Sequence, residues 1–166
     1  DNILSRSNML DAYNQVRANK GSAGIDGITI DEIDDYLRKH WRSTKELIKQ
    51  RKYKPQPVLR VEIPKPNGGV RQLGIPTVMD RMIQQAIVQV ISPICEPYFS
   101  EKSYGFRPNR SCEQAVIQLL EYLNDGYEWI VDIDLEKFFD TVPQDRLMSL
   151  VHNIIQDGDT ESLIRK

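Results

Sequence analysis

Apolar side chains at every second position alternate with acids in the stretch Trp129-Ile-Val-Asp-Ile-Asp-Leu-Glu136. This period of two predicts a strand with one apolar face and one acidic face. On the acidic face, strand geometry places Asp132 and Asp134 roughly 7 Å apart. Carboxylates beside so apolar a run, followed by Phe138 and Phe139, indicate a divalent-cation site presented by a packed sheet. A charged face that simply meets water is the equally compatible alternative.

Elsewhere, apolar residues spaced by three and four predict a mostly helical chain. The expected helices cover residues 7–19, 31–41, 44–52 and 77–90, with two more beginning at 111 and 143. Ser7 is the expected cap of the first helix, and Ser111 with Gln114 forms a capping box for the fifth. Two prolines, Pro93 and Pro97, are expected to end the fourth helix.

Two short strands are predicted over residues 58–63 and 70–75, joined by Lys65-Pro-Asn-Gly-Gly69. The Asn67-Gly68 pair is a strong hairpin-turn signal. Prolines on both sides favour an edge hairpin that projects from the body.

A loop with three glycines, Lys20-Gly-Ser-Ala-Gly-Ile-Asp-Gly27, precedes the hairpin. Glycine allows a backbone to approach a ligand closely. The loop lacks the Gly-Lys-Ser/Thr ending of a P-loop.

Composition restricts the class of protein. With 166 residues, 40% hydrophobic and 28% charged, the chain is typical of one soluble globular domain or a large part of one. No apolar run is long enough for a membrane span. The cysteines, Cys95 and Cys112, form neither a metal-type pair nor a disulfide framework, so we expect a reducing, cytoplasmic setting. The chain opens at Asp1 rather than at a methionine and has one core strand, so we expect a piece of a larger protein.

The net charge of −2 hides two opposite blocks. Residues 36–71 hold eleven Lys/Arg and two acids, a net charge of +9, whereas residues 121–161 hold eleven acids and two Lys/Arg, a net charge of −9. A basic block fits a polyanion and an acidic block fits metal ions. Two solvated faces that happen to segregate are the alternative.

Four motifs together resemble the N-terminal part of a group II intron reverse transcriptase of the maturase type. Asn19-Lys-Gly-Ser-Ala-Gly-Ile-Asp-Gly27 is similar to the family's N-terminal extension loop. The stretch from Tyr53 to Pro76, with Ile63-Pro-Lys-Pro-Asn-Gly-Gly-Val-Arg71, resembles the first fingers motif. Pro93 to Ser111, with Ser103-Tyr-Gly-Phe-Arg-Pro-Asn-Arg110, resembles the second, and Asp132 to Asp140 resembles the first palm motif.

The resemblance implies an α+β fingers-and-palm fold, mostly helical, with a projecting β-hairpin and an incomplete palm sheet. It implies residues 1–52 as the N-terminal extension and fingers helices, 53–128 as fingers and 129–166 as the first part of the palm. The implied activity is RNA-directed DNA synthesis with Mg²⁺. The implied partners are an RNA template, a DNA primer, dNTPs and group II intron RNA, without a membrane, and a homodimer is compatible with it.

The resemblance also assigns roles to residues. Asp134, five positions before Phe139, is the palm carboxylate that binds both metal ions, and the carbonyl of Leu135 adds a ligand. Phe139 matches the steric gate beneath the sugar of the incoming nucleotide. Lys65 and Arg71 match the fingers cations that hold its triphosphate. Asp132 is expected to be a supporting or salt-bridged acid.

One departure concerns the second palm motif, an aromatic-x-Asp-Asp hairpin. The adjacent aspartates here, Asp34 and Asp35, lie in a helical stretch. A two-metal centre needs carboxylates from both motifs. We therefore expect residues 1–166 alone to be inactive in synthesis.

Three other interpretations remain. A haloacid dehalogenase-type phosphatase also begins with Asp-x-Asp, but it requires Thr or Val where this chain has Glu136. A non-catalytic maturase module would bind intron RNA with the loop residues Lys20, Gly21, Ser22 and Gly24 and with Arg107 and Arg110. A piece that serves interaction or dimerisation is the third. The two arginines could instead pair with acids such as Glu96.

Overall fold

The structure, a computed structural model, describes residues 2–166. It is mostly helical, with one two-stranded sheet, which confirms the expected α+β class. In chain order the elements are α1 (Arg6–Ala18), α2 (Ile33–Lys49), β1 (Leu59–Pro64), β2 (Val70–Ile75), α3 (Val78–Cys95), the 3₁₀ helix η1 (Glu96–Tyr98), α4 (Cys112–Asn124), α5 (Phe138–Thr141), α6 (Gln144–Ile155) and α7 (Gly158–Ile164). None of the described helices combines the length and apolar composition needed to cross a bilayer.

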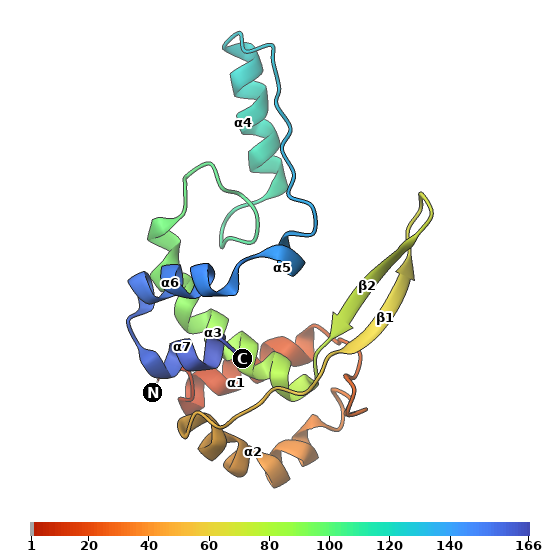
Figure 1. The fold of residues 1–166 in the computed structure, drawn as a ribbon, viewed down its shortest axis with the longest axis vertical. Coiled ribbons are helices and arrows are strands. Elements are labelled where there is room, and N and C mark those ends of the chain that lie inside the picture. Colours follow the sequence, from red (N-terminus) through yellow and green to blue (C-terminus); the bar gives the residue numbers. More distant parts are fainter. Residues whose placement is uncertain (1) are drawn as a thin grey trace.

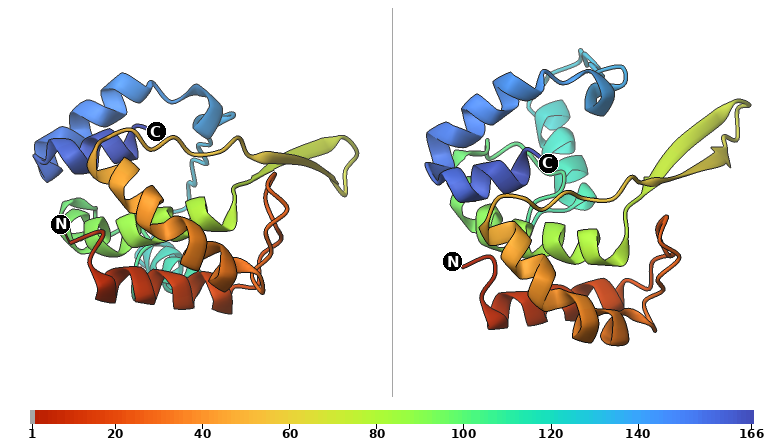
Figure 2. Two further views of the ribbon diagram at one scale, coloured as in Figure 1. Left: turned by 90° about the horizontal axis from the view of Figure 1, so that it is seen from below. Right: turned by 60° about the horizontal axis from the view of Figure 1, so that its bottom comes forward.

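Helix α3 is the central element of the body, with α1 packed along it and α6 against another side (Figure 1). The views in Figure 2 show α2 beside α1 and α3, on the outside of the helical body. Five side chains of α3 belong to the apolar core, together with side chains of α1 and α2. Asn8 also ties α1 to α3, because its side-chain amide donates to the carbonyl of Ala86 at 2.9 Å. Helices α1, η1 and α6 therefore take their positions directly from α3.

Three predicted helix limits were wrong. The cap of α1 is Ser5 rather than Ser7, because the hydroxyl oxygen of Ser5 accepts from the amide of Asn8 at 3.4 Å. Residues 33–49 form one helix instead of two, since Ser43 donates its hydroxyl to the His40 carbonyl and stays inside the helix. Helix α3 passes through Pro93, whose position in the last turn removes one amide donor without ending the helix.

The predicted hairpin is confirmed. Strands β1 and β2 pair antiparallel, from Leu59 opposite Ile75 to Pro64 opposite Val70. The turn closes where the amide of Gly68 donates to the carbonyl of Lys65 at 3.1 Å. Gly68 has φ +82°, a conformation that strongly favours glycine. The hairpin projects from the helical body (Figures 1 and 2).

The predicted strand over residues 129–136 was wrong. This segment runs back beside α4 without pairing to a strand (Figure 1), and Trp129 is 93% exposed. Its alternating pattern can become a strand only against a neighbouring strand, and the sheet within residues 2–166 consists of β1 and β2. The capping box of Ser111 and Gln114 at the start of α4 is confirmed.

A close approach fixes the glycine loop of residues 20–27 against the start of α3. Gly24 is buried, and a Cβ on it would lie 2.7 Å from the backbone of Thr77. No side chain fits there unless one backbone moves, so this position needs glycine.

We predict that Gly24→Ala lowers the free energy of unfolding by about 1–3 kcal/mol, because an added methyl group overpacks the contact with Thr77. Chemical denaturation of the full-length protein measures the change. The matched control is Gly105→Ala, since a Cβ added to Gly105 would have no atom of residues 2–166 within 4 Å apart from its chain neighbours. That control should stay within about 0.5 kcal/mol of the parent protein. Equal losses in both variants would contradict the close packing of the loop.

Candidate functional site

The hairpin presents two cations at and near its tip. Lys65 lies in the turn, and Arg71 lies on β2 opposite Ile63. Both side chains are exposed, and neither forms an ion pair within residues 2–166. Their charges are therefore available to an anionic ligand.

The acidic segment leads into the one-turn helix α5. Asp134 is exposed, and its Oδ1 accepts from the amide of Leu135 at 2.9 Å. Phe139 is 89% exposed on α5, and its ring meets that of Phe138 edge to face at a centroid distance of 5.8 Å. Asp132 was expected to be a supporting or a salt-bridged acid, and among the described residues it forms no ion pair.

Carboxylate and carbonyl oxygens at Asp134 and Leu135 are the hard donors that Mg²⁺ prefers. Across residues 2–166, however, the structure gathers no group of three or more acidic, histidine or cysteine side chains suited to a metal ion. These two residues fit Mg²⁺ as part of a larger ligand set. No hydrogen bond or ion pair within that range joins Asp134 to the hairpin cations.

The glycine loop lies on the N-cap and the first turn of α3. The carbonyl of Ser22 accepts from the guanidinium of Arg81 at 2.6 Å. Gly21 lies so close to the same guanidinium that a Cβ there would overlap it. Lys20, which precedes these residues, is exposed. The glycines thus approach a neighbouring helix, which the composition of the loop did not distinguish from approach to a ligand.

The loop of residues 103–110 is organised by Arg107. Its side chain is 8% exposed and donates to Glu96 at 2.7 Å and to the carbonyls of Ser100 and Ser103. The hydrogen bond from Arg107 lowers the pKa of the Glu96 carboxyl, and the positive charge of Arg107 adds to the effect. The alternative of an ion pair with Glu96 is therefore confirmed for Arg107.

Arg110 has a different environment from Arg107. Its guanidinium carbon lies 5.6 Å from the centre of the Tyr104 ring, a cation–π distance. A partly exposed guanidinium beside an aromatic ring is a surface on which a nucleic-acid base can stack.

Asp80, in the first turn of α3, is a buried acid that the sequence did not single out. It is 3% exposed and accepts from the hydroxyls of Tyr53 and Thr77 and from the amide of Gln56, the last two at 2.7 and 3.2 Å. Burial raises the pKa of the Tyr53 phenol, and the hydrogen bond to Asp80 adds to the rise. The Thr77-x-x-Asp80 spacing, a capping signature, was a signal for part of this network.

The basic block of residues 36–71 is only partly neutralised. Arg51 pairs with Asp159 of the acidic block at 2.6 Å, and Arg38 and Lys49 pair with acids on their own helix. Eight cations of the block have no ion pair among residues 2–166: Lys39, Arg42, Lys45, Lys52, Lys54, Arg60, Lys65 and Arg71. These residues supply the net positive surface.

Comparison with known proteins identifies the family. The profile of the family described as reverse transcriptase (RNA-dependent DNA polymerase) matches residues 63–165. Group II intron-encoded protein LtrA of Lactococcus lactis subsp. cremoris is 36% identical over 93% of this chain, and protein YkfC of Escherichia coli is 36% identical over 86%. Nuclear intron maturase 1, mitochondrial, of Arabidopsis thaliana is 30% identical over 54%.

The chain therefore belongs to the reverse transcriptase family, and its resemblance to the group II intron type is confirmed. It spans 26%, 39% and 12% of the lengths of LtrA, YkfC and the Arabidopsis maturase, respectively.

We predict that the full-length protein binds single-stranded RNA with an affinity that falls as salt rises. The log–log slope should be about −0.7 for each phosphate contact. The test variant replaces four unpaired cations of the basic block with glutamine, at Lys39, Arg42, Lys52 and Lys54. Its slope should be shallower than that of the parent by up to about 0.7 for each lost phosphate contact. Fluorescence anisotropy of labelled RNA over a salt series measures the slope of log affinity against log salt concentration.

A charge-matched control changes four cations outside the block to glutamine, at Arg6, Lys137, Arg146 and Arg165. This control should keep the parent slope, because the removed charges lie outside the basic block. Equal slopes in the two variants would show that net charge, rather than the basic block, controls binding.

Proposed function

We propose that the protein containing this chain is an RNA-directed DNA polymerase encoded by a group II intron. One observation carries the proposal: a single family match, over residues 63–165, includes both the hairpin cation Lys65 and the acidic residue Asp134. Triphosphate binding and metal binding then belong to one domain. We assign residues 1–52 to the N-terminal extension and fingers helices, 53–128 to fingers and 129–166 to the first part of the palm.

The hairpin binds the incoming dNTP in this proposal. Lys65 and Arg71 are exposed cations without ion-pair partners among residues 2–166. Their attraction for the triphosphate needs no existing salt bridge to break. An arginine can also donate two parallel hydrogen bonds to one phosphate, which fixes its orientation.

Asp134 and the carbonyl of Leu135 would hold Mg²⁺ together with carboxylates from another part of the protein. When bound, Mg²⁺ would stabilise negative charge on the reacting phosphoryl oxygens. Asp134 would hold the ion on the segment that also carries Phe139. The exposed ring of Phe139 then lies beneath the sugar and excludes a 2′-hydroxyl by steric overlap.

Binding of intron RNA during splicing is a second function, favoured by the N-terminal loop and the loop of Arg110. Lys20 is exposed beside Gly21, Ser22 and Gly24, and Arg110 lies beside the Tyr104 ring. A maturase among the relatives supports this role. Arg107 would act here by holding its loop in shape, since its side chain already donates to Glu96 and to the carbonyls of Ser100 and Ser103. A homodimer and a cytoplasmic location are further proposals.

We predict that Asp134→Ala in the full-length protein reduces RNA-templated primer extension to background, whereas Asp132→Ala retains measurable synthesis. Asp134 is the proposed shared metal ligand, and its loss leaves the ions without that carboxylate. Extension assays with template, primer, dNTPs and Mg²⁺ measure both variants.

Thermal unfolding provides the control. Both aspartates are exposed, so each change should alter the free energy of unfolding by less than about 0.5 kcal/mol. Equal and complete loss of synthesis at both positions would contradict the assignment of the metal ligand to Asp134.

A further inference from the structure

Both ends of the hairpin attach to one turn of α3. The segment that leads into β1 is held by Asp80, which accepts from the Tyr53 hydroxyl and from the Gln56 amide at 3.2 Å. The segment that leaves β2 reaches Thr77, whose hydroxyl donates to the same carboxylate at 2.7 Å. One buried side chain therefore fastens the incoming and the outgoing strand.

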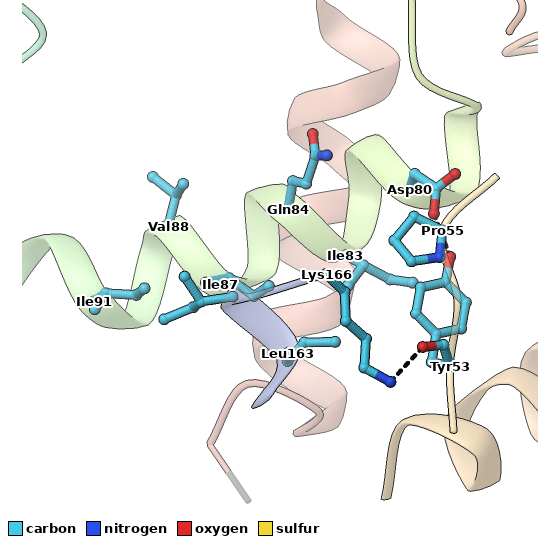
Figure 3. Close-up of a pocket in the computed structure, with 11 residues that line it drawn as sticks. Tyr53, Pro55, Asp80, Ile83, Gln84, Ile87, Val88, Ile91, Leu163 and Lys166 are labelled. Atoms are coloured by element: carbon cyan, nitrogen blue, oxygen red, sulfur yellow. Dashed lines mark hydrogen bonds between the residues drawn. The ribbon is translucent and has the colours of Figure 1, made fainter. Parts of the chain in front are cut away.

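The close-up in Figure 3 shows how this attachment is built. Tyr53 and Pro55 lie alongside α3, with Asp80 near the tyrosine hydroxyl. From the other side, Lys166 donates its amine to the carbonyls of Arg51 and Tyr53, each at 2.6 Å. The chain before β1 is thus restrained on two sides.

The glycine loop lies on the same turn. Gly24 approaches the backbone of Thr77, and Arg81 donates to the carbonyl of Ser22 at 2.6 Å. More than about 30 residues separate the loop from the hairpin in sequence, yet both are supported by the N-cap Thr77 and the first turn of α3, at Asp80 and Arg81. A shift of this turn therefore displaces both.

We infer that Thr77, Asp80 and Arg81 form a shared anchor that positions the glycine loop and the nucleotide-binding hairpin relative to each other. They are positioning residues, because they act through Lys65 and Arg71 on the hairpin and through the backbone of the loop. The catalytic part of this inference rests on the proposed function. The coupling of the two elements can be measured without any catalysis.

The test compares Asp80→Asn with the matched control Asp35→Asn in the full-length protein. Asparagine keeps the shape of Asp80 but replaces one acceptor oxygen with an amide donor, which cannot accept from Gln56 or from a hydroxyl. Asp35 is a surface aspartate on α2 with 77% of its side chain exposed. Hydrogen exchange is followed over residues 20–27 and 59–75.

Asp80→Asn should accelerate exchange in both segments together, and Asp35→Asn in neither. In primer extension, Asp80→Asn should raise the KM for dNTP about tenfold with a smaller change in kcat, the size expected when one hydrogen bond to a charged group is lost from positioning. A purely structural role would change the melting temperature without this split between KM and kcat.

A second pair of variants addresses folding. Thr77→Ser keeps the hydroxyl, so hydrogen exchange in both segments should match that of the parent protein. Thr77→Val keeps the volume but loses the hydroxyl, so exchange in both segments should accelerate as in Asp80→Asn. Faster exchange in only one segment would overturn the shared anchor. Equal exchange rates in Thr77→Ser and Thr77→Val would overturn it as well. If the parent protein lacks RNA-templated synthesis, the proposed function fails and the catalytic part with it, while exchange still decides the coupling.

Discussion

A polar group loses its water when it is buried, and the fold has to replace those hydrogen bonds. Asp80 meets this constraint at the start of α3 with three donors: two hydroxyls and a backbone amide. Because the donors come from Tyr53, Gln56 and Thr77, satisfying one carboxylate also determines where the hairpin leaves the body. The glycine loop, packed on the same turn, takes its position from this arrangement.

Features encoded by neighbouring residues could be predicted from the sequence. The Asn67-Gly68 turn and the capping box of Ser111 and Gln114 each depend on contacts within four residues, and both are present. The segment of residues 129–136 differs, because its alternation specifies a strand only when another strand lies beside it. Pro93 was misjudged for a similar reason, since the effect of a proline depends on how near it lies to the end of a helix.

For the candidate site, the exposed cations Lys65 and Arg71 were predictable because a hairpin tip faces solvent. The role of Arg107 was not, since its pairing with Glu96 depends on how an 11-residue segment folds back. Asp80 shows the same limit over 27 residues: the sequence contains the Thr77-x-x-Asp80 spacing but gives no sign of Tyr53. Close approach to a ligand and close approach to α3 both require glycine, so the loop of residues 20–27 was ambiguous.

A double-mutant cycle between Tyr53→Phe and Gly24→Ala tests the shared anchor most directly. Tyr53→Phe removes one donor on the hairpin side, and Gly24→Ala strains the loop side, with the first turn of α3 between them. Unfolding free energies of the parent, both single variants and the double variant give the coupling. A shared anchor predicts a coupling free energy of at least about 0.5 kcal/mol. Additivity within about 0.3 kcal/mol would mean that loop and hairpin are held independently, which would contradict the account.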